Sequence, residues 1–158
     1  MIREMLQSDS ARVLDIYRMG LETRNSTFET IVPSWTEWDA RHHSHSRFVD
    51  IENENITGWI ALSPFSSRQV YKGVAEVSIY VDPLYQRRKI GSQLMKQVID
   101  SSEKNGLWTL FSSVFPENEA TLKLHQKFGF RIIGSREKIA MLDGKWRDTI
   151  LLERRSKK

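Results

Sequence analysis

Segments typical of strands alternate with segments typical of helices along this chain, and their order restricts the possible folds more than any other feature. β-prone runs occupy residues 1–5, 47–51, 56–62, 74–81, 107–115, 130–142 and 146–152, and helical patterns occupy residues 8–24, 34–45, 90–102 and 118–128. Some runs are joined by tight turns, among them Asp143-Gly144, and others are separated by a helix. Tight turns join antiparallel strands whereas parallel strands need a longer crossover, so the sheet must be mixed. We predict one α/β (α+β) domain over residues 1–158, with the order β-α-α-β-β-β-α-β-α-β-β.

Polar residues and glycines indicate where the helices begin and end. Ser8, Ser34 and Asn118 precede or open helical patterns, and we expect their side chains to cap the helices. Asn105-Gly106 and Gly129 follow two of the patterns and favour the left-handed turn that ends many helices. The predicted boundaries therefore agree with the predicted order.

Composition excludes several classes of protein. The chain has no cysteine, which rules out disulfides, thiolate metal sites and a cysteine nucleophile. No apolar run is long enough to span a bilayer and the first five residues do not begin a signal peptide, so we expect a cytoplasmic protein without a membrane partner. The net charge is +4, but the basic tail at 154–158 holds four of the 24 basic residues, and the remainder equals the 20 acidic residues. We therefore expect no nucleic-acid partner.

The stretch from Tyr80 to Ser92 combines the end of a strand, a short basic loop and the start of an amphipathic helix. The N–H groups at a helix N-terminus lack intrahelical acceptors, and with the helix dipole they favour an anion. Arg87, Arg88 and Lys89 add positive charge there. The arrangement suits a pyrophosphate, whereas the Gly-Lys-Ser/Thr ending of a nucleotide P-loop is absent. From these residues alone, a solvated basic surface is the alternative.

This stretch resembles the acetyl-CoA loop of the GNAT superfamily of acetyltransferases, which reads Gln/Arg-x-x-Gly-x-Gly/Ala between a strand and a helix. The segment Gln86-Arg87-Arg88-Lys89-Ile90-Gly91 fits with one departure, because Lys89 replaces the first glycine. The main-chain donor is kept, and we expect φ at Lys89 in a range that non-glycine residues can adopt.

Other segments extend the resemblance over nearly the whole chain. Residues 118–130 resemble the second family signature, Asn-x-x-(Ala/Ser)-x-x-Leu-(Tyr/His)-x-x-x-Gly-Phe. Residues 23–28, 65–71 and 74–81 resemble the phosphinothricin/methionine sulfoximine acetyltransferase-like branch. The motifs occur in the family's order and spacing, which makes them specific together.

The resemblance implies a mostly antiparallel sheet, acetyl-CoA as the co-substrate and a small amine acceptor, such as an amino acid or an analogue. It also implies a homodimer, for which the apolar hairpin at 130–152 is a candidate interface. The implied coenzyme contacts are Ile79, Tyr80, Val81, Gln86, Arg87, Arg88, Lys89, Ile90, Gly91, Ser92, Asn118 and Thr121. Two alternatives stay open: an acetyltransferase that acts on protein N-termini or lysines, and a non-catalytic acyl-CoA-binding module.

Acetyl transfer to an amine needs a base for the ammonium proton and an acid for the leaving thiolate. Glu76 is the candidate base, because a central strand would partly bury its carboxyl and raise the pKa, and the resemblance places a catalytic glutamate here. An exposed glutamate that pairs with a neighbour is the alternative. His125 stands where many relatives have a tyrosine that protonates the thiolate, and imidazole can do this since its pKa is near neutrality. A histidine that only packs is the alternative.

Arg24, Phe28, Arg68 and Tyr71 are candidates for acceptor binding. A guanidinium group can clamp a carboxylate, and an aromatic ring can form a wall for an amino-acid side chain. The branch usually has another arginine near Ser66, and its absence argues against phosphinothricin itself.

A metal role for the histidines is the remaining interpretation. His42 and His45 can share a helical face, with His43 between them. No cysteine and no nearby carboxylate pattern accompanies them, so a polar surface is the better interpretation and we expect no metal.

Overall fold

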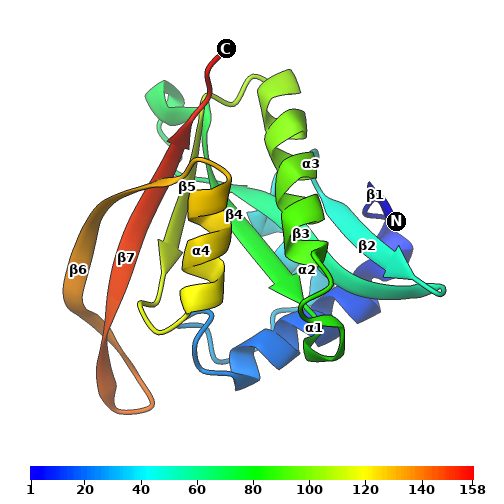
Figure 1. Ribbon diagram of the computed structural model, residues 1–158, viewed down its shortest axis with the longest axis horizontal. Helices are drawn as coiled ribbons and strands as arrows, with labels where there is room; N and C mark the ends of the chain where they lie inside the picture. The colour runs from blue at the N-terminus through cyan, green and yellow to red at the C-terminus, as the bar shows by residue number, and fades with distance from the viewer.

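The computed structural model describes residues 1–158 as one seven-stranded sheet with helices on both faces (Figure 1). The strands are β1 (Ile2–Glu4), β2 (Phe48–Glu52), β3 (Asn55–Pro64), β4 (Val74–Val81), β5 (Thr109–Val114), β6 (Arg131–Leu142) and β7 (Lys145–Arg155). Their order across the sheet is β1-β2-β3-β4-β5-β7-β6, and every neighbouring pair is antiparallel except β4 and β5. The prediction of a mixed, mostly antiparallel sheet is confirmed.

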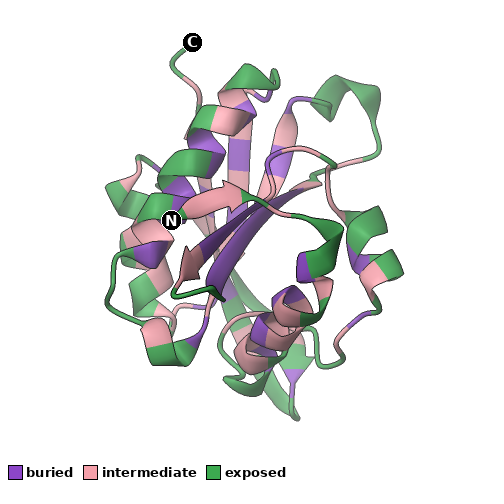
Figure 2. Ribbon diagram, turned by 90° about the vertical axis from the view of Figure 1, so that its right-hand side faces the viewer, coloured by how far each residue is buried: buried purple, intermediate pink, exposed green.

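The helices divide between the two faces of the sheet. They are α1 (Ser10–Glu22), α2 (Trp35–Arg41), α3 (Ile90–Lys104) and α4 (Glu119–Lys127), with single 3-10 turns at Gln7–Asp9, Gln69–Tyr71 and Pro83–Tyr85. Figure 1 shows α3 and α4 in front of the sheet. On the opposite face, Val13 and Ile16 of α1 and Trp38 of α2 form one apolar cluster with Trp59 of β3. The two layers cover most of the sheet, whose central strands are buried in Figure 2.

Strand β3 is buried on both faces, because it lies between the two helical layers. Ile60 and Leu62 belong to the cluster beneath α3, while Trp59 and Ala61 face α1 and α2. The alternation follows from the pleat, which points successive side chains to opposite faces. Burial at every position is therefore expected here, and residues 56–62, which are apolar except for Thr57, are all buried.

The central strands β4 and β5 pair over only a short distance. Val74 pairs with Thr109, Ala75 with Leu110 and Glu76 with Phe111, and no further pair follows. Beyond this point β4 remains paired with β3, and β5 remains paired with β7. The sheet therefore splits between two parallel strands after Glu76 and Phe111, and main-chain groups on both sides of the split are left without a strand partner.

The predicted order of elements is confirmed, and two predicted helix boundaries are wrong. Ser8 lies inside a 3-10 turn, and Asp9 rather than Ser8 is the N-cap residue of α1. The second helix ends at Arg41, and His42 is extended with φ of −112° and ψ of 150°. His42 and His45 therefore share no helical face. Ser34 caps α2 as predicted, since its side chain accepts a hydrogen bond from the Glu37 N–H.

The basic C-terminal residues are more ordered than a free tail. Arg154 and Arg155 are part of β7, and the Arg154 guanidinium and the Lys158 ammonium both pair with Glu103 at the end of α3. None of the helices has the length and hydrophobicity that a bilayer crossing requires.

Candidate active site

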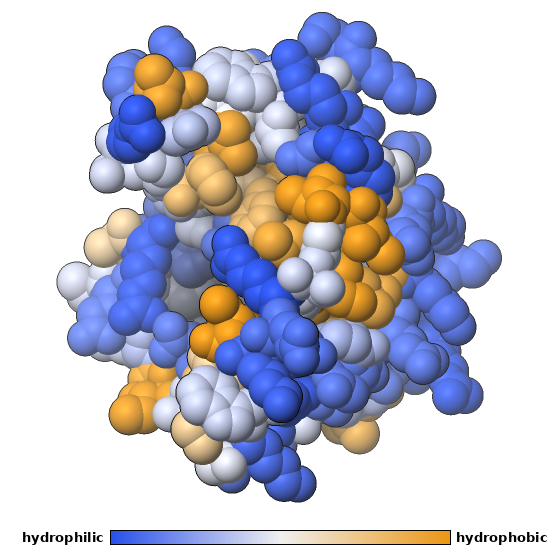
Figure 3. Space-filling model, turned by 90° about the vertical axis from the view of Figure 1, so that its left-hand side faces the viewer, coloured by the Kyte–Doolittle hydropathy of each residue, from blue (hydrophilic) through white to orange (hydrophobic).

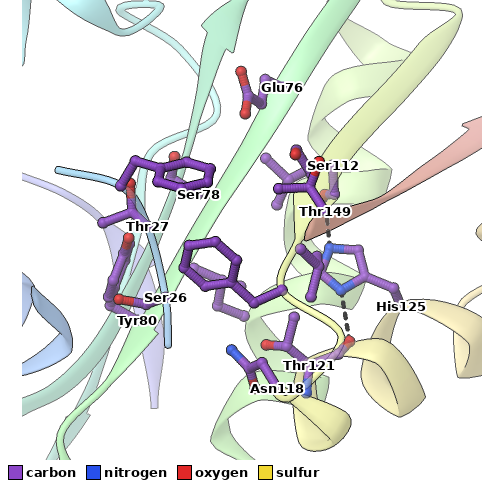
Figure 4. A pocket seen from close by; sticks show the side chains of 16 residues that line it. Ser26, Thr27, Glu76, Ser78, Tyr80, Ser112, Asn118, Thr121, His125 and Thr149 are labelled. Atoms are coloured by element: carbon purple, nitrogen blue, oxygen red, sulfur yellow. Dashed lines mark hydrogen bonds between the residues drawn. The ribbon is translucent and has the colours of Figure 1, made fainter. Parts of the chain in front are cut away.

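A pocket opens where β4 and β5 separate, and Figure 4 shows its side chains. Main chain and side chains from both strands, the loop after α1, helix α4 and strand β7 contribute to it. The lining residues are Ser26, Thr27, Phe28, Glu76, Val77, Ser78, Ile79, Tyr80, Ser112, Ser113, Val114, Phe115, Asn118, Thr121, His125 and Thr149. Glu76 is the only carboxylate among them, and neither lysine nor arginine is present. The pocket is therefore rich in hydroxyl groups and contains one strong base candidate.

The Glu76 side chain has neither a hydrogen bond nor an ion pair within the protein, and its carboxyl lies at one end of the pocket (Figure 4). Burial alone raises the pKa of this carboxyl above its usual range. The alternative of an exposed glutamate paired with a neighbour is thus inconsistent with the structure. A carboxylate that is poorly solvated and unpaired is a stronger proton acceptor than one in water.

His125 is buried on α4, on the opposite side of the pocket from Glu76. Its Nδ1 lies 2.7 Å from the Thr121 carbonyl oxygen, and its Nε2 lies 2.7 Å from Ser112 Oγ. Phe130 packs edge-on against the imidazole, and burial lowers the pKa of His125 below its usual value. The imidazole is therefore neutral around pH 7, and both of its nitrogens already have partners.

A groove runs from this pocket to the start of α3, and it contains almost every residue expected to contact the coenzyme. Ile79, Tyr80, Val81, Gln86, Arg87, Lys89, Ile90, Gly91, Ser92, Asn118 and Thr121 all line it. Ser26, Ile79, Tyr80, Asn118 and Thr121 belong to both the groove and the pocket, so the two are continuous. Arg88 is the exception, because its guanidinium pairs with Glu52 and lies over the Tyr85 ring at 5.2 Å.

The start of α3 has the features of an anion site. The first intrahelical bond runs from the Gln93 N–H to the Lys89 carbonyl, so the N–H groups of Ile90, Gly91 and Ser92 have no acceptor within the helix. A Cβ at Gly91 would lie 3.2 Å from Leu124 of α4, so the glycine permits the close approach of the two helices that wall the groove. These donors and the adjacent Arg87 and Lys89 fit a pyrophosphate.

Lys89, which stands where the family has a glycine, adopts a backbone conformation that glycine reaches most easily. Its φ of 62° and ψ of 14° lie in the left-handed region, and Arg87 also has a positive φ, of 64°. This small region is open to L residues at a cost of roughly 1–2 kcal/mol. Lys89 therefore stays within the range that a non-glycine residue can adopt, at this cost.

Of the four residues expected to bind the acceptor, only Phe28 lines the pocket, where its ring packs edge-on against Phe115 at 4.9 Å. The Arg24 side chain pairs with Asp143 in the β6–β7 turn. Arg68 lies over the Tyr71 ring at 5.5 Å, at the opposite end of β4 from the groove. The structure therefore does not bring Arg24, Arg68 and Tyr71 together with Phe28.

Two pocket residues, Ser112 and Thr149, and one residue outside the pocket, Arg147, have no counterpart in the sequence predictions. Ser112 hydrogen-bonds His125, and Thr149 is buried with a hydroxyl that has no partner, so it is free to bond an occupant of the pocket. Arg147 of β7 holds the loop after α1: it donates to the Arg24 carbonyl at 2.8 Å and to Asn25 Oδ1 at 2.9 Å. The alternation of β5 and β7 was the only available signal for these residues.

Asn118 has two structural roles. Its Oδ1 accepts a hydrogen bond from the Thr121 N–H at 3.3 Å, which caps α4 as predicted. Its Nδ2 donates to the Asn25 carbonyl at 3.2 Å, so the cap also fixes the loop that carries Phe28. The three other histidines lie elsewhere: His42 bonds the Trp38 carbonyl, His43 stacks on His45, and the structure has no group of three or more residues placed to hold a metal.

Comparison with known proteins agrees with this geometry. The model of the acetyltransferase (GNAT) family matches residues 11–130. The Bacillus subtilis (strain 168) protein YwnH, provisionally named a phosphinothricin acetyltransferase, is 33% identical over 151 residues, which are 92% of this chain and 93% of that protein. The phosphinothricin N-acetyltransferase of Streptomyces coelicolor is 26% identical over 161 residues, with coverage of 97% and 94%. The acetyl-CoA complex of a phosphinothricin acetyltransferase from Sinorhizobium meliloti has the same fold, with a TM-score of 0.90, 22% identity and coverage of 98% and 87%. The chain belongs to the acetyltransferase (GNAT) family.

Proposed function

We propose that this protein transfers the acetyl group of acetyl-CoA to the primary amine of a small acceptor, an amino acid or an analogue of the phosphinothricin or methionine sulfoximine type. Membership of the family and the names of the relatives support this reaction. The pocket at the split between β4 and β5 is the observation that supports it best, because this pocket joins the anion site of α3 to an unpaired, half-buried carboxylate.

The residues of the groove hold the coenzyme in this proposal. The free N–H groups at 90–92 bind the pyrophosphate, aided by Arg87 and Lys89. The edge of β4 at Ile79 to Val81 that faces β5 has no strand partner, so its main-chain groups can bond the pantetheine arm as they would bond a neighbouring strand. This arrangement directs the thioester toward the split in the sheet.

Glu76 acts as the base that removes a proton from the ammonium group of the acceptor. A free amino group is mostly protonated at neutral pH and cannot attack a carbonyl carbon in that form. The raised pKa of Glu76 brings its proton affinity closer to that of the amine, which favours the transfer.

The shape and chemistry of the pocket favour a small acceptor over a protein. The segment Ser26 to Phe28 closes one side, and the Arg147 and Asn118 hydrogen bonds fix the residues directly before it. A protein N-terminus or lysine would need an open peptide groove there. A non-catalytic module would have no need of an unpaired, half-buried carboxylate, whose partial loss of solvation is costly.

The test is a panel of amines with acetyl-CoA, in which release of the CoA thiol is followed with a thiol reagent. The protein itself gives no thiol background, since it has no cysteine. We expect turnover with α-amino acids or their analogues and none with peptides that carry a free N-terminus. Turnover only with peptides would replace the proposal with the protein acetyltransferase, and coenzyme binding without turnover would favour the binding module.

We also propose a homodimer through the hairpin of β6 and β7, in a cytoplasmic protein. Large apolar side chains are exposed along this hairpin, and Figure 3 shows an apolar patch on the face that presents it. They are Ile132, Ile133, Ile139, Met141 and Trp146. Strand β6 is also the edge of the sheet, where unpaired main-chain groups can join a second copy. Light scattering at micromolar concentration should give the dimer mass, and Ile139→Lys should give the monomer; a monomer for the unmodified chain would refute the dimer.

A further inference from the structure

The hydrogen-bond partners of Ser112 and His125 determine where the serine hydroxyl proton and the imidazole proton lie. The Thr121 carbonyl oxygen can only accept, so the His125 nitrogen that bonds it, Nδ1, must carry the ring proton. In the neutral imidazole Nε2 is then an acceptor, and the Ser112 hydroxyl must donate to it. Ser112 therefore directs its proton to His125 and keeps lone pairs for another donor.

The His125 ring lines the pocket, but this geometry leaves neither of its nitrogens free to bond an occupant. Both ring nitrogens are already bonded, and the ring is buried against Phe130. Ser112 lines the pocket on β5, on the other side of the split from β4 and Glu76. Of the two groups bonded to the imidazole nitrogens, only the Ser112 hydroxyl can both give and take a proton, so it is the available proton path between His125 and an occupant of the pocket.

We propose that Ser112 is a catalytic residue that relays a proton between the reacting atoms and His125, an inference that rests on the proposed acetyl transfer. When the nitrogen–carbon bond forms and the carbon–sulfur bond breaks, the acceptor nitrogen must lose a proton and the sulfur must gain one. The nitrogen gives its proton to Ser112 Oγ while the Ser112 proton moves to His125 Nε2.

The return follows the same path. The leaving thiolate takes a proton from Ser112 Oγ, and His125 Nε2 gives its proton back to the serine. The pair ends in its original state, and no further reactant is consumed. Glu76 has a separate task, because it removes the ammonium proton before the attack.

The alternative is that Ser112 only satisfies a buried imidazole. The relay and this structural role differ in how the losses of kcat in the Ser112 and His125 variants combine, which a double-mutant cycle measures. If the relay operates, Ser112→Ala and His125→Phe interrupt the same path. Each should lower kcat by about a hundredfold, the lower end of what general acid–base catalysis contributes. The double variant should lose no more than about threefold beyond either one.

Two further variants control the experiment. Ser112→Thr keeps a hydroxyl on the strand and should recover most of the lost kcat. Ser102→Ala removes another buried serine hydroxyl, which donates to the Ile99 carbonyl in α3 outside the pocket, and should leave kcat unchanged. Losses that multiply in the double variant, or a Ser112→Ala enzyme with the kcat of the unmodified protein, would overturn the relay.

Nitrogen NMR of the unmodified protein with labelled histidine measures the tautomer of His125 directly and needs no substrate. We expect His125 as the neutral tautomer with its proton on Nδ1, and a proton on Nε2 would overturn the relay even if the variants do not fold. If the unmodified protein released no thiol with any amine, the proposed function would fail, whereas the tautomer would still report on Ser112 and His125.

Discussion

Glu76 and Phe111 form the last pair between β4 and β5, and the pocket begins directly beyond them. The pair thus fixes where the sheet opens and places the Glu76 carboxyl at the end of the opening. A parallel pair in an otherwise antiparallel sheet is held by few hydrogen bonds here, while the outer strands stay paired on each side. Only the inner edges of the two strands lose their partners at the split, because β3 and β7 continue to pair with the outer edges.

The neighbouring arginines of the basic loop should differ in their effect on the coenzyme. Arg87 lines the groove, whereas Arg88 is held by Glu52 and Tyr85. Arg87→Ala should raise the KM for acetyl-CoA by about tenfold, which corresponds to about 1.4 kcal/mol. Arg88→Ala should change it less than about twofold, as expected for an exposed ion pair. Steady-state kinetics at varied acetyl-CoA measures both, and equal effects would contradict the assignment.

Lys89 should be replaceable by glycine with a gain in stability. Its φ of 62° is unfavourable for any residue with a Cβ, and Lys89→Ala keeps that cost while Lys89→Gly removes it. Both variants lose the same charge, so the comparison isolates the backbone. The free energy of unfolding in urea should be about 1 kcal/mol higher for the glycine variant than for the alanine variant. An alanine variant of equal or greater stability would show that the loop adapts.

Local patterns predicted much of the fold, because they depend on residues close in sequence. The Asp143-Gly144 turn and the caps at Ser34 and Asn118 follow from side-chain and backbone preferences, and the structure contains all three. The alternation along residues 74–81 also placed Glu76 on the face opposite Val77.

The features of the site that the sequence did not predict depend on contacts between residues far apart in the chain. Ser112 and His125 meet because α4 returns over β5, and Arg147 bonds Asn25 although 122 positions separate them. No local pattern contains such a contact. The acceptor candidates failed to converge for a similar reason: Arg24 and Arg68 follow loop motifs, and the partners of a loop are set by the strands around it.

Arg147 should influence the acceptor without contacting it. Its guanidinium bonds Arg24 and Asn25 and lies 4.2 Å over the Phe115 ring, so it fixes the loop that supplies Phe28. Arg147→Ala should raise the KM for the acceptor by about tenfold and leave that for acetyl-CoA unchanged, since about 1.4 kcal/mol of ordering is lost. Arg147→Lys should recover little, because an ammonium cannot bond both groups in the same geometry. A matching rise in the KM for acetyl-CoA would instead indicate a general loss of structure.

Replacement of Glu76 by glutamine keeps the shape of the side chain and removes its basicity. Glu76→Gln should lower kcat by about 10²–10⁴-fold, with nearly unchanged affinity for acetyl-CoA. The defect should shrink at high pH, where more of the acceptor arrives as the free amine. An enzyme with unchanged turnover at neutral pH, under conditions where chemistry limits the rate, would remove Glu76 from the mechanism.

The same substitution should stabilise the protein at neutral pH. Burial raises the pKa of Glu76 in the folded state, so the folded protein binds more protons than the unfolded chain between the two pKa values. Stability is therefore lost as pH rises from the unfolded pKa through the raised folded pKa, and the loss persists above it. Glutamine has no such loss, so Glu76→Gln should unfold at a higher temperature than the unmodified protein at about pH 7. The advantage should fall toward zero at about pH 4, near the unfolded pKa of a glutamate. Thermal unfolding at both pH values measures this difference, and a constant or reversed difference would show that the carboxylate is stabilised by a group within the pocket.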